Sequence, residues 1–363
     1  MQSMLSIMEY TMPHIIMARA PVRNADLGGW RDTRLFSSGK VLNMAIRLYT
    51  YVSLVPMKEK GIRIESHDIG GTEYIRNLRD IEYAGTLGLL KAAVGSSGAR
   101  GGFKLIVRSE APPASGLGSS AALAVAVLGA LYRYQGKNLL PHHIAMNAQR
   151  LETELLGLEC GVQDQFCAAY GGINYMDVRY PDAHVLPVPV SDGFLCALEA
   201  SLLVVYTGKS HFSSATHQKV IEEYEKKNPR VMGAFDRLAR TAAVGMDALL
   251  KGSLQELAGA TNDNWEQQKL LHPSITTPEV ENLRTSVFTH GALGFKLNGA
   301  GAGGTATVIC APDRTHEVEK MIRTTFPVMT IMNAKLDFGR CQGLQVWERE
   351  NGRSEKEDVK RKA

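Results

Sequence analysis

The alternation of apolar and polar residues along the chain predicts a set of β-strands. The clearest example is the run 103–108, where Phe103, Leu105 and Val107 occupy every second position, the period of a strand with one buried face. The predicted strand nearest the N-terminus, His14–Val22, contains Pro21, which interrupts regular pairing. The other predicted strands are Val41–Pro56, Gly61–His67, Gly172–Val178, Leu203–Thr207, Val328–Phe338 and Gly343–Trp347.

Between the strands, apolar positions recur every three or four residues, which predicts amphipathic helices. Residues 81–94 and a segment from Pro141 to about Leu158 show this spacing, and the run from Ser119 is small and apolar enough for a buried helix. Because strands and helices are mixed, we expect an α/β (α+β) protein. The longest helical block is predicted in four stretches, 213–227, 230–250, 252–263 and 277–290.

Composition narrows the class of protein. The chain has 363 residues, 44% hydrophobic and 21% charged, enough for a large core in one large or two closely joined domains. A net charge of +4 without an aromatic-interleaved basic stripe predicts no nucleic-acid partner. Residues 1–13 lack a leader-like pattern and no run of 18 apolar residues occurs, so we expect a cytoplasmic protein with no membrane partner. The cysteines lack a CxxC pair and are expected to be buried free thiols: Cys160, Cys167, Cys196, Cys310 and Cys341.

A Gly/Ser segment joins the strand at 103–108 to the apolar helix. From Pro112 to Ala122 it reads Pro-Pro-Ala-Ser-Gly-Leu-Gly-Ser-Ser-Ala-Ala, and Gly116 and Gly118 permit backbone conformations that side chains forbid. A helix start at Ser119, capped by the serines, would offer free N–H groups and the positive dipole end to a phosphate. The spacing is not that of Walker A. Taken alone, the segment is equally well interpreted as a Gly-rich turn before a core helix.

Three further segments place polar residues or glycines in unusual settings. Asp164 lies between two amides in a helix of small apolar residues, so it needs either a partner or a function, or it is a capping acid that faces solvent. Residues 23–33 form a polar, glycine-containing loop that alone would be a solvated turn. Residues 299–304 contain four glycines between apolar strands, which allow a very close backbone approach where a tight hairpin would explain two.

These segments resemble the signatures of the GHMP kinases, the family named for galactokinase, homoserine kinase, mevalonate kinase and phosphomevalonate kinase. Residues 112–122 match its ATP loop, Pro-x3-Gly-Leu-Gly/Ser-Ser-Ser-Ala, and residues 299–304 match its third signature, which packs against that loop. The other matching residues are Ala20, Pro21, Arg23 and Asp32 of its N-terminal element and Cys160, Gly161, Asp164 and Gln165 of its catalytic segment.

The resemblance spans about residues 14–347 and implies a GHMP kinase fold. Residues 1–200 would form an N-terminal domain with a mixed sheet and the ATP-loop helix. Residues 201–348 would form a ferredoxin-like C-terminal domain that supplies the second glycine loop. Residues 349–363 are expected to be a charged tail.

The resemblance also implies a role for each part of the site, with ATP and Mg²⁺ as cofactors. Asp164 would orient or deprotonate the acceptor hydroxyl, and Arg23 would lower its pKa or neutralise charge on the γ-phosphate. Ser120 and Glu152 would ligate the metal. The implied ATP-binding residues are Pro113, Gly116, Leu117, Gly118, Ser119, Ser120 and Ala121, and the implied substrate-binding residues are Asp32, Gly28, Gly29, Gly172 and Gly301.

The sequence of the N-terminal loop, residues 23–33, indicates which kind of acceptor is phosphorylated. Its Gly28 to Thr33 sequence, Gly-Gly-Trp-x-Asp-Thr, resembles heptose-7-phosphate kinases and fucokinases more than galactokinases, although Ala25 stands where the family often has an acid or Asn. The implied activity is transfer of the γ-phosphoryl group to a sugar or sugar-phosphate C1 hydroxyl by a monomer or homodimer. A catalytically silent sugar or ATP sensor and an isoprenoid-pathway kinase or decarboxylase are the alternatives. Candidates for binding an acceptor phosphate are Arg31, Lys209 and His211.

Overall fold

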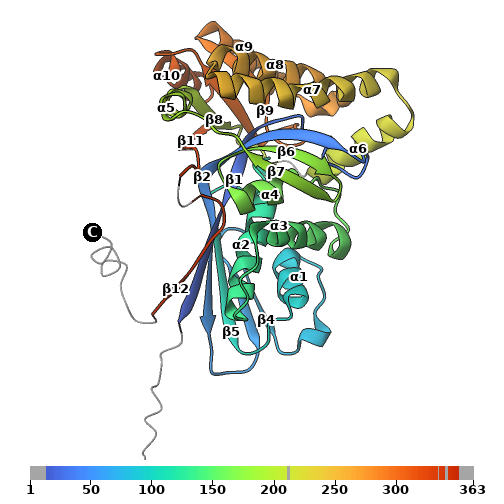
Figure 1. Ribbon diagram of the computed structural model, residues 1–363, viewed down its shortest axis with the longest axis vertical. Helices are drawn as coiled ribbons and strands as arrows, with labels where there is room; N and C mark the ends of the chain where they lie inside the picture. Colours follow the sequence, from blue (N-terminus) through green and yellow to red (C-terminus); the bar gives the residue numbers. More distant parts are fainter. Residues whose placement is uncertain (1–13, 211–212, 334, 340–341, 351–363) are drawn as a thin grey trace, which may run out of the picture.

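The computed structural model of the chain contains two β-sheets and their covering helices, arranged along one long axis (Figure 1). The larger sheet and helices α1–α4 occupy one half, and the smaller sheet with α7–α10 occupies the other. The structure describes residues 14–210, 213–333, 335–339 and 342–350. The expectations for residues 1–13, His211, Cys341 and the tail residues 351–363 fall outside these ranges.

The larger sheet has eight strands within the described residues. They are β1 (Ile15–Leu27), β2 (Gly39–Pro56), β3 (Ile62–Ser66), β4 (Gly71–Ile75), β5 (Phe103–Ser109), β6 (Ile173–Arg179), β7 (Asp182–Pro187) and β12 (Gln345–Arg349). Their order is β12-β1-β2-β5-β3-β4, with β6 paired to β2 and to β7. Only β3 and β5 pair in parallel among these strands, so the sheet is mixed, as expected.

Strand β2 extends the larger sheet into the second half of the molecule. Its residues Thr50–Pro56 pair with β5, whereas Gly39–Met44 pair with β6. Strand β1 follows β2 over this whole length, with register shifts after Pro21 and between Asn24 and Leu27. The polar end of β1 is thereby carried out of the first half and toward the smaller sheet, where the site lies (Figure 1).

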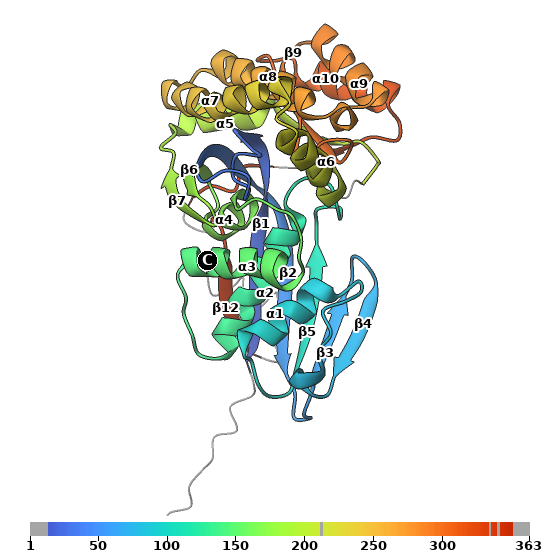
Figure 2. The same cartoon turned by 90° about the vertical axis from the view of Figure 1, so that its right-hand side faces the viewer.

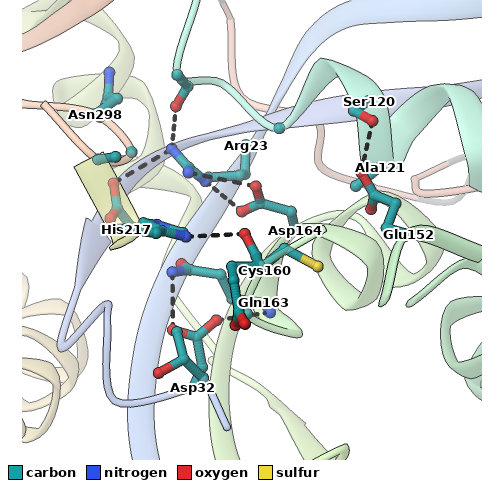
Figure 3. Close-up of a pocket in the computed structure, with 18 of the residues that line it drawn as sticks. Arg23, Asp32, Ser120, Ala121, Glu152, Cys160, Gln163, Asp164, His217 and Asn298 are labelled. Atoms are coloured by element: carbon teal, nitrogen blue, oxygen red, sulfur yellow. Dashed lines mark hydrogen bonds and ion pairs between the residues drawn. The ribbon is translucent and has the colours of Figure 1, made fainter. Parts of the chain in front are cut away.

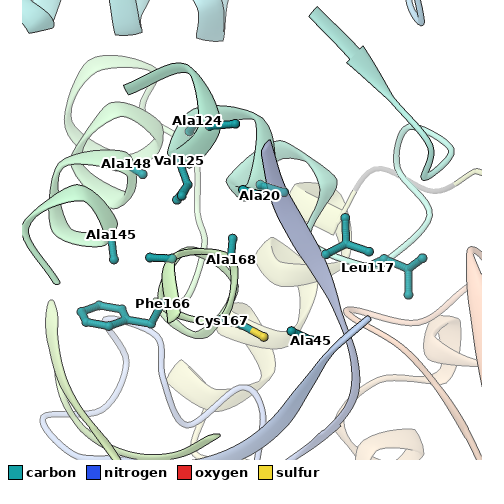
Figure 4. Close-up of a cluster of buried hydrophobic side chains, with 14 of the residues drawn as sticks. Ala20, Ala45, Leu117, Ala124, Val125, Ala145, Ala148, Phe166, Cys167 and Ala168 are labelled. Atoms are coloured by element: carbon teal, nitrogen blue, oxygen red, sulfur yellow. The ribbon is translucent and has the colours of Figure 1, made fainter. Parts of the chain in front are cut away.

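Helices cover one face of the larger sheet (Figure 2). They are α1 (Gly88–Ser97), α2 (Ser119–Tyr134), α3 (Pro141–Arg150) and α4 (Gln163–Tyr170). Helices α2 and α4 pack on β1 and β2, and α1 and α3 pack against α2. Buried alanines of five elements line this contact, with Phe166 beside them, so the helices approach the strands closely (Figure 4). The labelled alanines are Ala20, Ala45, Ala124, Ala145, Ala148 and Ala168.

The smaller sheet is antiparallel and has the order β11-β8-β10-β9. Its strands are β8 (Leu202–Tyr206), β9 (Ala292–Leu297), β10 (Thr305–Cys310) and β11 (Thr330–Met332). The helices of this half are α5 (Asp192–Ser201), α6 (Ser213–Glu225), α7 (Pro229–Lys251), α8 (Leu254–Leu271), α9 (Pro278–Thr289) and α10 (Thr315–Thr325). Helices lie between β8 and β9 and between β10 and β11, which gives the βαββαβ connectivity of the expected ferredoxin-like half.

Several boundaries differ from the sequence-based expectation. Strand β1 continues to Leu27, so the polar loop is shorter than residues 23–33. Helix α1 begins at Gly88, because Gly85 has φ +85° and interrupts the segment 81–94. Helix α3 ends at Arg150 and passes into a π-helical turn. Helices α5 and α10 were not predicted from the sequence. For α5, the prolines that precede it indicated an irregular edge strand.

The structure tests two expectations from composition, the burial of the cysteines and the lack of a membrane-spanning helix. Cys160, Cys167, Cys196 and Cys310 are free thiols, as expected, but Cys196 is exposed and Cys160 is half-buried. Burial was therefore the wrong expectation for these two. Among the described residues, no helix is both long and apolar enough to cross a bilayer.

Candidate active site

A cavity of about 380 Å³ lies where the starts of α2 and α4, the polar end of β1 and the second glycine loop meet. Figure 3 shows Ser120, Ala121 and Glu152 at one end and Asp32 and His217 at the other, with Asp164 between them. We call these the nucleotide end and the acceptor end. The predicted residues that line the cavity are Arg23, Asp32, Gly116, Gly118, Ser119, Ser120, Ala121, Glu152, Asp164 and Gly301.

Arg23 joins the two ends through Asp164. Its Nε donates to Asp164 Oδ1 at 2.7 Å, and its Nη1 donates to the carbonyl oxygen of Gly116 in the ATP loop. Its main-chain N–H donates to Leu117 O at 2.9 Å. The guanidinium is 4% exposed, so these bonds form in a medium that strengthens them. Asp164 is thus held in one orientation beside the loop that would carry the phosphates.

A second ion pair lies below Arg23 and was missed from the sequence. Lys296 Nζ is fully buried and donates to Asp26 Oδ1 at 2.8 Å, and Arg23 Nη1 lies 3.4 Å from the same oxygen. Burial alone would raise the pKa of Asp26, but the two cations outweigh it and lower that pKa. The sequence does contain a signal for this pair. Lys296 lies within an apolar strand just before a glycine loop, and a buried lysine requires an acidic partner.

A backbone bulge sets the position of Asp26. Ala25 has φ +51°, and the register of β1 on β2 shifts between Asn24 and Leu27. Bulges of this kind redirect side chains and occur next to active sites. This bulge explains how an acid one place beyond the family position still reaches Arg23.

The nucleotide end is built from two glycine loops in backbone contact. A Cβ added at Gly116 would lie 2.6 Å from Asn298 O, and one at Gly299 would lie 3.0 Å from the Cα of Gly116. Gly304 faces Ser115 O in the same way, at 2.5 Å. Side chains at these positions would force the loops apart, which accounts for Gly299 and Gly304 of the second loop.

The start of α2 differs from the expected serine cap. Gly118 is the N-cap residue, with φ +73°, and no side chain caps the helix. The N–H groups of the first turn are therefore left for a ligand, and the 16-residue helix directs its positive end at the cavity. A Cβ on Gly118 would lie 2.9 Å from Asp164 Cγ, so glycine also admits the carboxylate.

Glu152 lies on the π-helical turn Leu151–Leu155 that follows α3. Its Oε1 accepts a 2.6 Å hydrogen bond from Ser120 Oγ, and its Oε2 accepts one of 2.5 Å from Gln165 Nε2. Burial raises the pKa of Glu152, and these two bonds partly offset that effect. π-helical turns are frequent at functional sites. Here the turn points a carboxylate at the start of α2.

Asp32 holds the start of α4 at the acceptor end. Its Oδ2 accepts the main-chain N–H groups of Val162 at 3.0 Å and Gln163 at 3.1 Å. Gly161 is required beside it, because a Cβ there would lie 2.0 Å from Asp32 Oδ2. The pKa of Asp32 is raised to about 6, first by burial and also by nearby Asp164, while the Gln163 N–H opposes the shift.

Several residues of the acceptor end were not predicted from the sequence, among them Trp30, Glu159, Gln163 and His217. His217 is on α6, and its Nδ1 lies 3.0 Å from Glu159 O, while its ring meets the edge of Trp30 at 4.5 Å between centroids. A single histidine inside a polar helix carries no pattern from which this position could be inferred.

Five predicted residues do not line the cavity. Gly28 donates its N–H to Thr241 Oγ1 and Asn264 Oδ1, and a Cβ there would lie 2.2 Å from Lys40 O. Gly172 donates its N–H to Asp337 O, and its φ of +71° favours glycine. Each glycine thus has a structural reason for its position. The predicted residues outside the lining are Pro113, Leu117, Gly28, Gly29 and Gly172.

The described candidates for an acceptor-phosphate site also lie away from the cavity. The Arg31 guanidinium stacks over the Phe36 ring at 4.0 Å from its centroid. Lys209 is exposed and pairs with Glu279 at 3.2 Å. His211 is not among the described residues. Neither Arg31 nor Lys209 therefore faces the acceptor end.

A carboxylate fixed beside an open helix start and a glycine-lined backbone cradle is the arrangement of a small-molecule kinase, which relies on positioning and electrostatics. Residues 83–172 match the family described as GHMP kinases N terminal domain, and residues 245–327 match GHMP kinases C terminal. The chain belongs to the GHMP kinases, which are ATP-dependent phosphotransferases. The predicted family and fold class are confirmed.

Similar proteins were found in sequence and in structure. The chain is 26% identical over 321 residues to D-glycero-alpha-D-manno-heptose 7-phosphate kinase of Campylobacter jejuni, covering 85% of this chain and 93% of that protein. It is 29% identical over 319 residues to the bifunctional fucokinase/GDP-fucose pyrophosphorylase of Arabidopsis thaliana, covering 82% of this chain but 30% of that protein. The crystal structure of a D-glycero-D-manno-heptose 1-phosphate kinase from Bacteroides thetaiotaomicron has the same fold, with TM-score 0.74, 24% identity and coverage of 92% and 98%.

Proposed function

We propose that this chain transfers the γ-phosphoryl group of ATP to the anomeric C1 hydroxyl of a sugar or sugar phosphate. The similarity to proteins named as a heptose 7-phosphate kinase and a fucokinase supports a sugar acceptor. The observation that carries the proposal is the position of Asp164. Its carboxylate is fixed by Arg23 at 2.7 Å, between the ATP loop and the acceptor end.

In this mechanism the two glycine loops and the first turn of α2 hold the phosphates of ATP. Asp164 orients the acceptor hydroxyl and accepts its proton as the new O–P bond forms, while the bond from the γ-phosphorus to the β,γ-bridging oxygen breaks and ADP leaves. Arg23 stabilises the anionic form of Asp164 and faces the negative charge on the transferred group.

The residues at the nucleotide end fit Mg²⁺. Ser120 Oγ and Glu152 Oε1 are hard oxygen donors 2.6 Å apart, and both residues line the cavity at the start of α2. Gln165 fixes the other Glu152 oxygen, so the carboxylate is oriented in advance. Bound there, the ion would neutralise phosphate charge. The chain's contribution is to keep Ser120 and Glu152 together at the helix start.

The proposal is tested by measuring ADP release with a coupled assay across free sugars and sugar phosphates, with the product analysed for phosphate at C1. We expect ADP release that depends on the sugar and a stoichiometric sugar 1-phosphate. Asp164→Asn, purified in the same way, controls for contaminating kinases. No sugar-dependent ADP release across the panel would contradict the proposal and favour a silent sensor.

A further inference from the structure

The acceptor end presents hydrogen-bond acceptors that have no partner within the described chain. His217 Nδ1 lies 3.0 Å from the carbonyl oxygen of Glu159. A carbonyl oxygen only accepts, so Nδ1 carries the hydrogen and the neutral ring keeps its lone pair on Nε2. Burial lowers the pKa of His217, which favours this neutral form, although the Glu159 carbonyl and Asp164 oppose the shift. No described residue donates a hydrogen bond to Nε2.

Gln163 supplies a second acceptor of this kind. It is 7% exposed, lines the cavity, and directs its Nε2 toward Asp32 Oδ1 at 3.5 Å. Its Oε1 is buried and has no hydrogen-bond partner among the described residues. A buried amide oxygen left unpaired costs stability, so a ligand that donates to it would remove that cost. In Figure 3 Gln163 and Asp32 lie together, with His217 facing the same space.

Positive charge at the acceptor end is already paired. Among the cavity-lining residues that the structure describes, Arg23 alone is permanently cationic, and it is bonded to Asp164, Gly116 O and Asp26. Arg34, near the rim, donates two 2.8 Å bonds to the Glu159 carboxylate. Two carboxylates, Asp32 and Glu159, line this end. A doubly charged phosphate would meet anions there.

Building on the proposed sugar kinase activity, we propose that the acceptor is an uncharged sugar, not a sugar phosphate, and that His217 and Gln163 select it by accepting hydrogen bonds from its hydroxyl groups. A sugar supplies O–H donors to these atoms, whereas a phosphate dianion supplies only acceptor oxygens. Trp30, edge-on to His217, adds an apolar wall for the C–H face of a sugar ring. The hydroxyl groups and ring of an uncharged sugar therefore suit the acceptor atoms of His217 and Gln163 and the apolar face of Trp30.

The first experiment compares matched pairs, namely mannose with mannose 6-phosphate and D-glycero-D-manno-heptose with its 7-phosphate, in the ADP-release assay. We expect kcat/KM to be at least 100-fold higher for the uncharged member of a pair. Preference for the phosphorylated member would overturn this inference and leave the sugar kinase activity intact. If neither member is turned over, the proposed function fails, and calorimetric binding of the same pairs decides the inference. Tighter binding of the phosphorylated member, or no binding of either, would then overturn it.

The second experiment tests His217 with the full chain. His217→Phe keeps a ring against Trp30 but removes Nε2, and we expect the acceptor KM to rise 10- to 100-fold with the ATP KM within twofold. His217→Gln returns a polar atom near the Nε2 position and should recover part of the loss. His184→Phe, on the exposed face of β7, is the control. An acceptor KM that stays within twofold in His217→Phe, with the protein folded, removes His217 from this role.

Discussion

The two ends of the cavity are formed by different kinds of atoms. The nucleotide end consists of main-chain atoms and glycines, and its side chains bond to one another, as Ser120 does to Glu152 and Arg23 to Asp164. The acceptor end consists of side chains from four separate elements, and His217 and Gln163 keep unpaired atoms there. Main-chain N–H donors, which do not depend on side-chain identity, suit a ligand shared by a whole family. Unpaired side-chain atoms suit the ligand that distinguishes one member from another.

The largest expected effect comes from the group that both ends share. Asp164→Asn keeps an oxygen for Arg23 but can no longer take a proton, so we expect kcat to fall by about 10³-fold. The ATP Kd should stay within about threefold, because the phosphates are held by the glycine loops and the start of α2. Coupled turnover assays give kcat, and calorimetry gives the Kd.

Glu154→Gln is the matched control for Asp164→Asn. Glu154 is an exposed acid that pairs with Arg150 at 3.1 Å, two residues from Glu152. It should keep wild-type kcat. A kcat within tenfold of wild type in folded Asp164→Asn would show that this carboxylate is not the base.

The nucleotide end and the fold were predictable from sequence because their constraints are local. Gly116, Gly299 and Gly304 are needed where two backbones nearly touch, and such contacts leave a short glycine pattern in the sequence. The strand alternation of β3 and β5 likewise depends only on which face is buried.

The acceptor end was less predictable because its groups come together only through the tertiary fold. His217 and Glu159 are 58 positions apart, and Lys296 and Asp26 are 270 apart. Gly28 and Gly172 show the converse limit, since each has a packing role that a motif alone could not separate from ligand binding. The bulge at Ala25 depends on the register of β1 with β2, which no single strand specifies.

The second prediction concerns the charge of Asp32. Its pKa in the folded protein is about 6, raised first by burial, whereas the unfolded chain releases this proton near pH ~4. The folded state therefore binds more protons between these values, and this contribution to stability is full below about pH 4 and lost as the pH rises through about 6. The loss amounts to about 3 kcal/mol by pH 7.

Asp32→Asn should remove this pH dependence while its side-chain oxygen still accepts from Val162 and Gln163. Urea unfolding from pH 4 to pH 7 measures it: the free energy of unfolding of wild type minus that of Asp32→Asn should decline across the range. Asp263→Asn, on the exposed side of α8, controls for the loss of one negative charge. A difference that does not change with pH, or that rises, would refute the prediction.

The third prediction displaces a charged group of the acceptor end without removing any charge. Gly161→Ala places a Cβ 2.0 Å from the present position of Asp32 Oδ2, so the carboxylate must move. We expect the acceptor KM to rise about tenfold, equivalent to about 1.4 kcal/mol, with the ATP KM unchanged. Gly193→Ala, where a Cβ meets nothing within 4 Å, is the control. Equal changes in both KM values would mean that the two ends are not separable.

The smallest effect on stability and on the acceptor KM is expected from substitution of Arg31. This substitution tests whether Arg31 belongs to the acceptor end of the cavity. The guanidinium lies 4.0 Å from the Phe36 ring centroid and is half-buried, so Arg31→Ala should cost about 0.5–1 kcal/mol of stability through the lost cation–π contact. The acceptor KM should change less than twofold, for free sugars and sugar phosphates alike. Phe36→Leu removes the same contact from the other side but also loses ring packing on Tyr224 and Phe235, so urea unfolding should show a larger stability loss for it. A tenfold KM increase in Arg31→Ala confined to phosphorylated sugars would place this cation at the acceptor end, because only a direct contact with the phosphate could separate the two substrates.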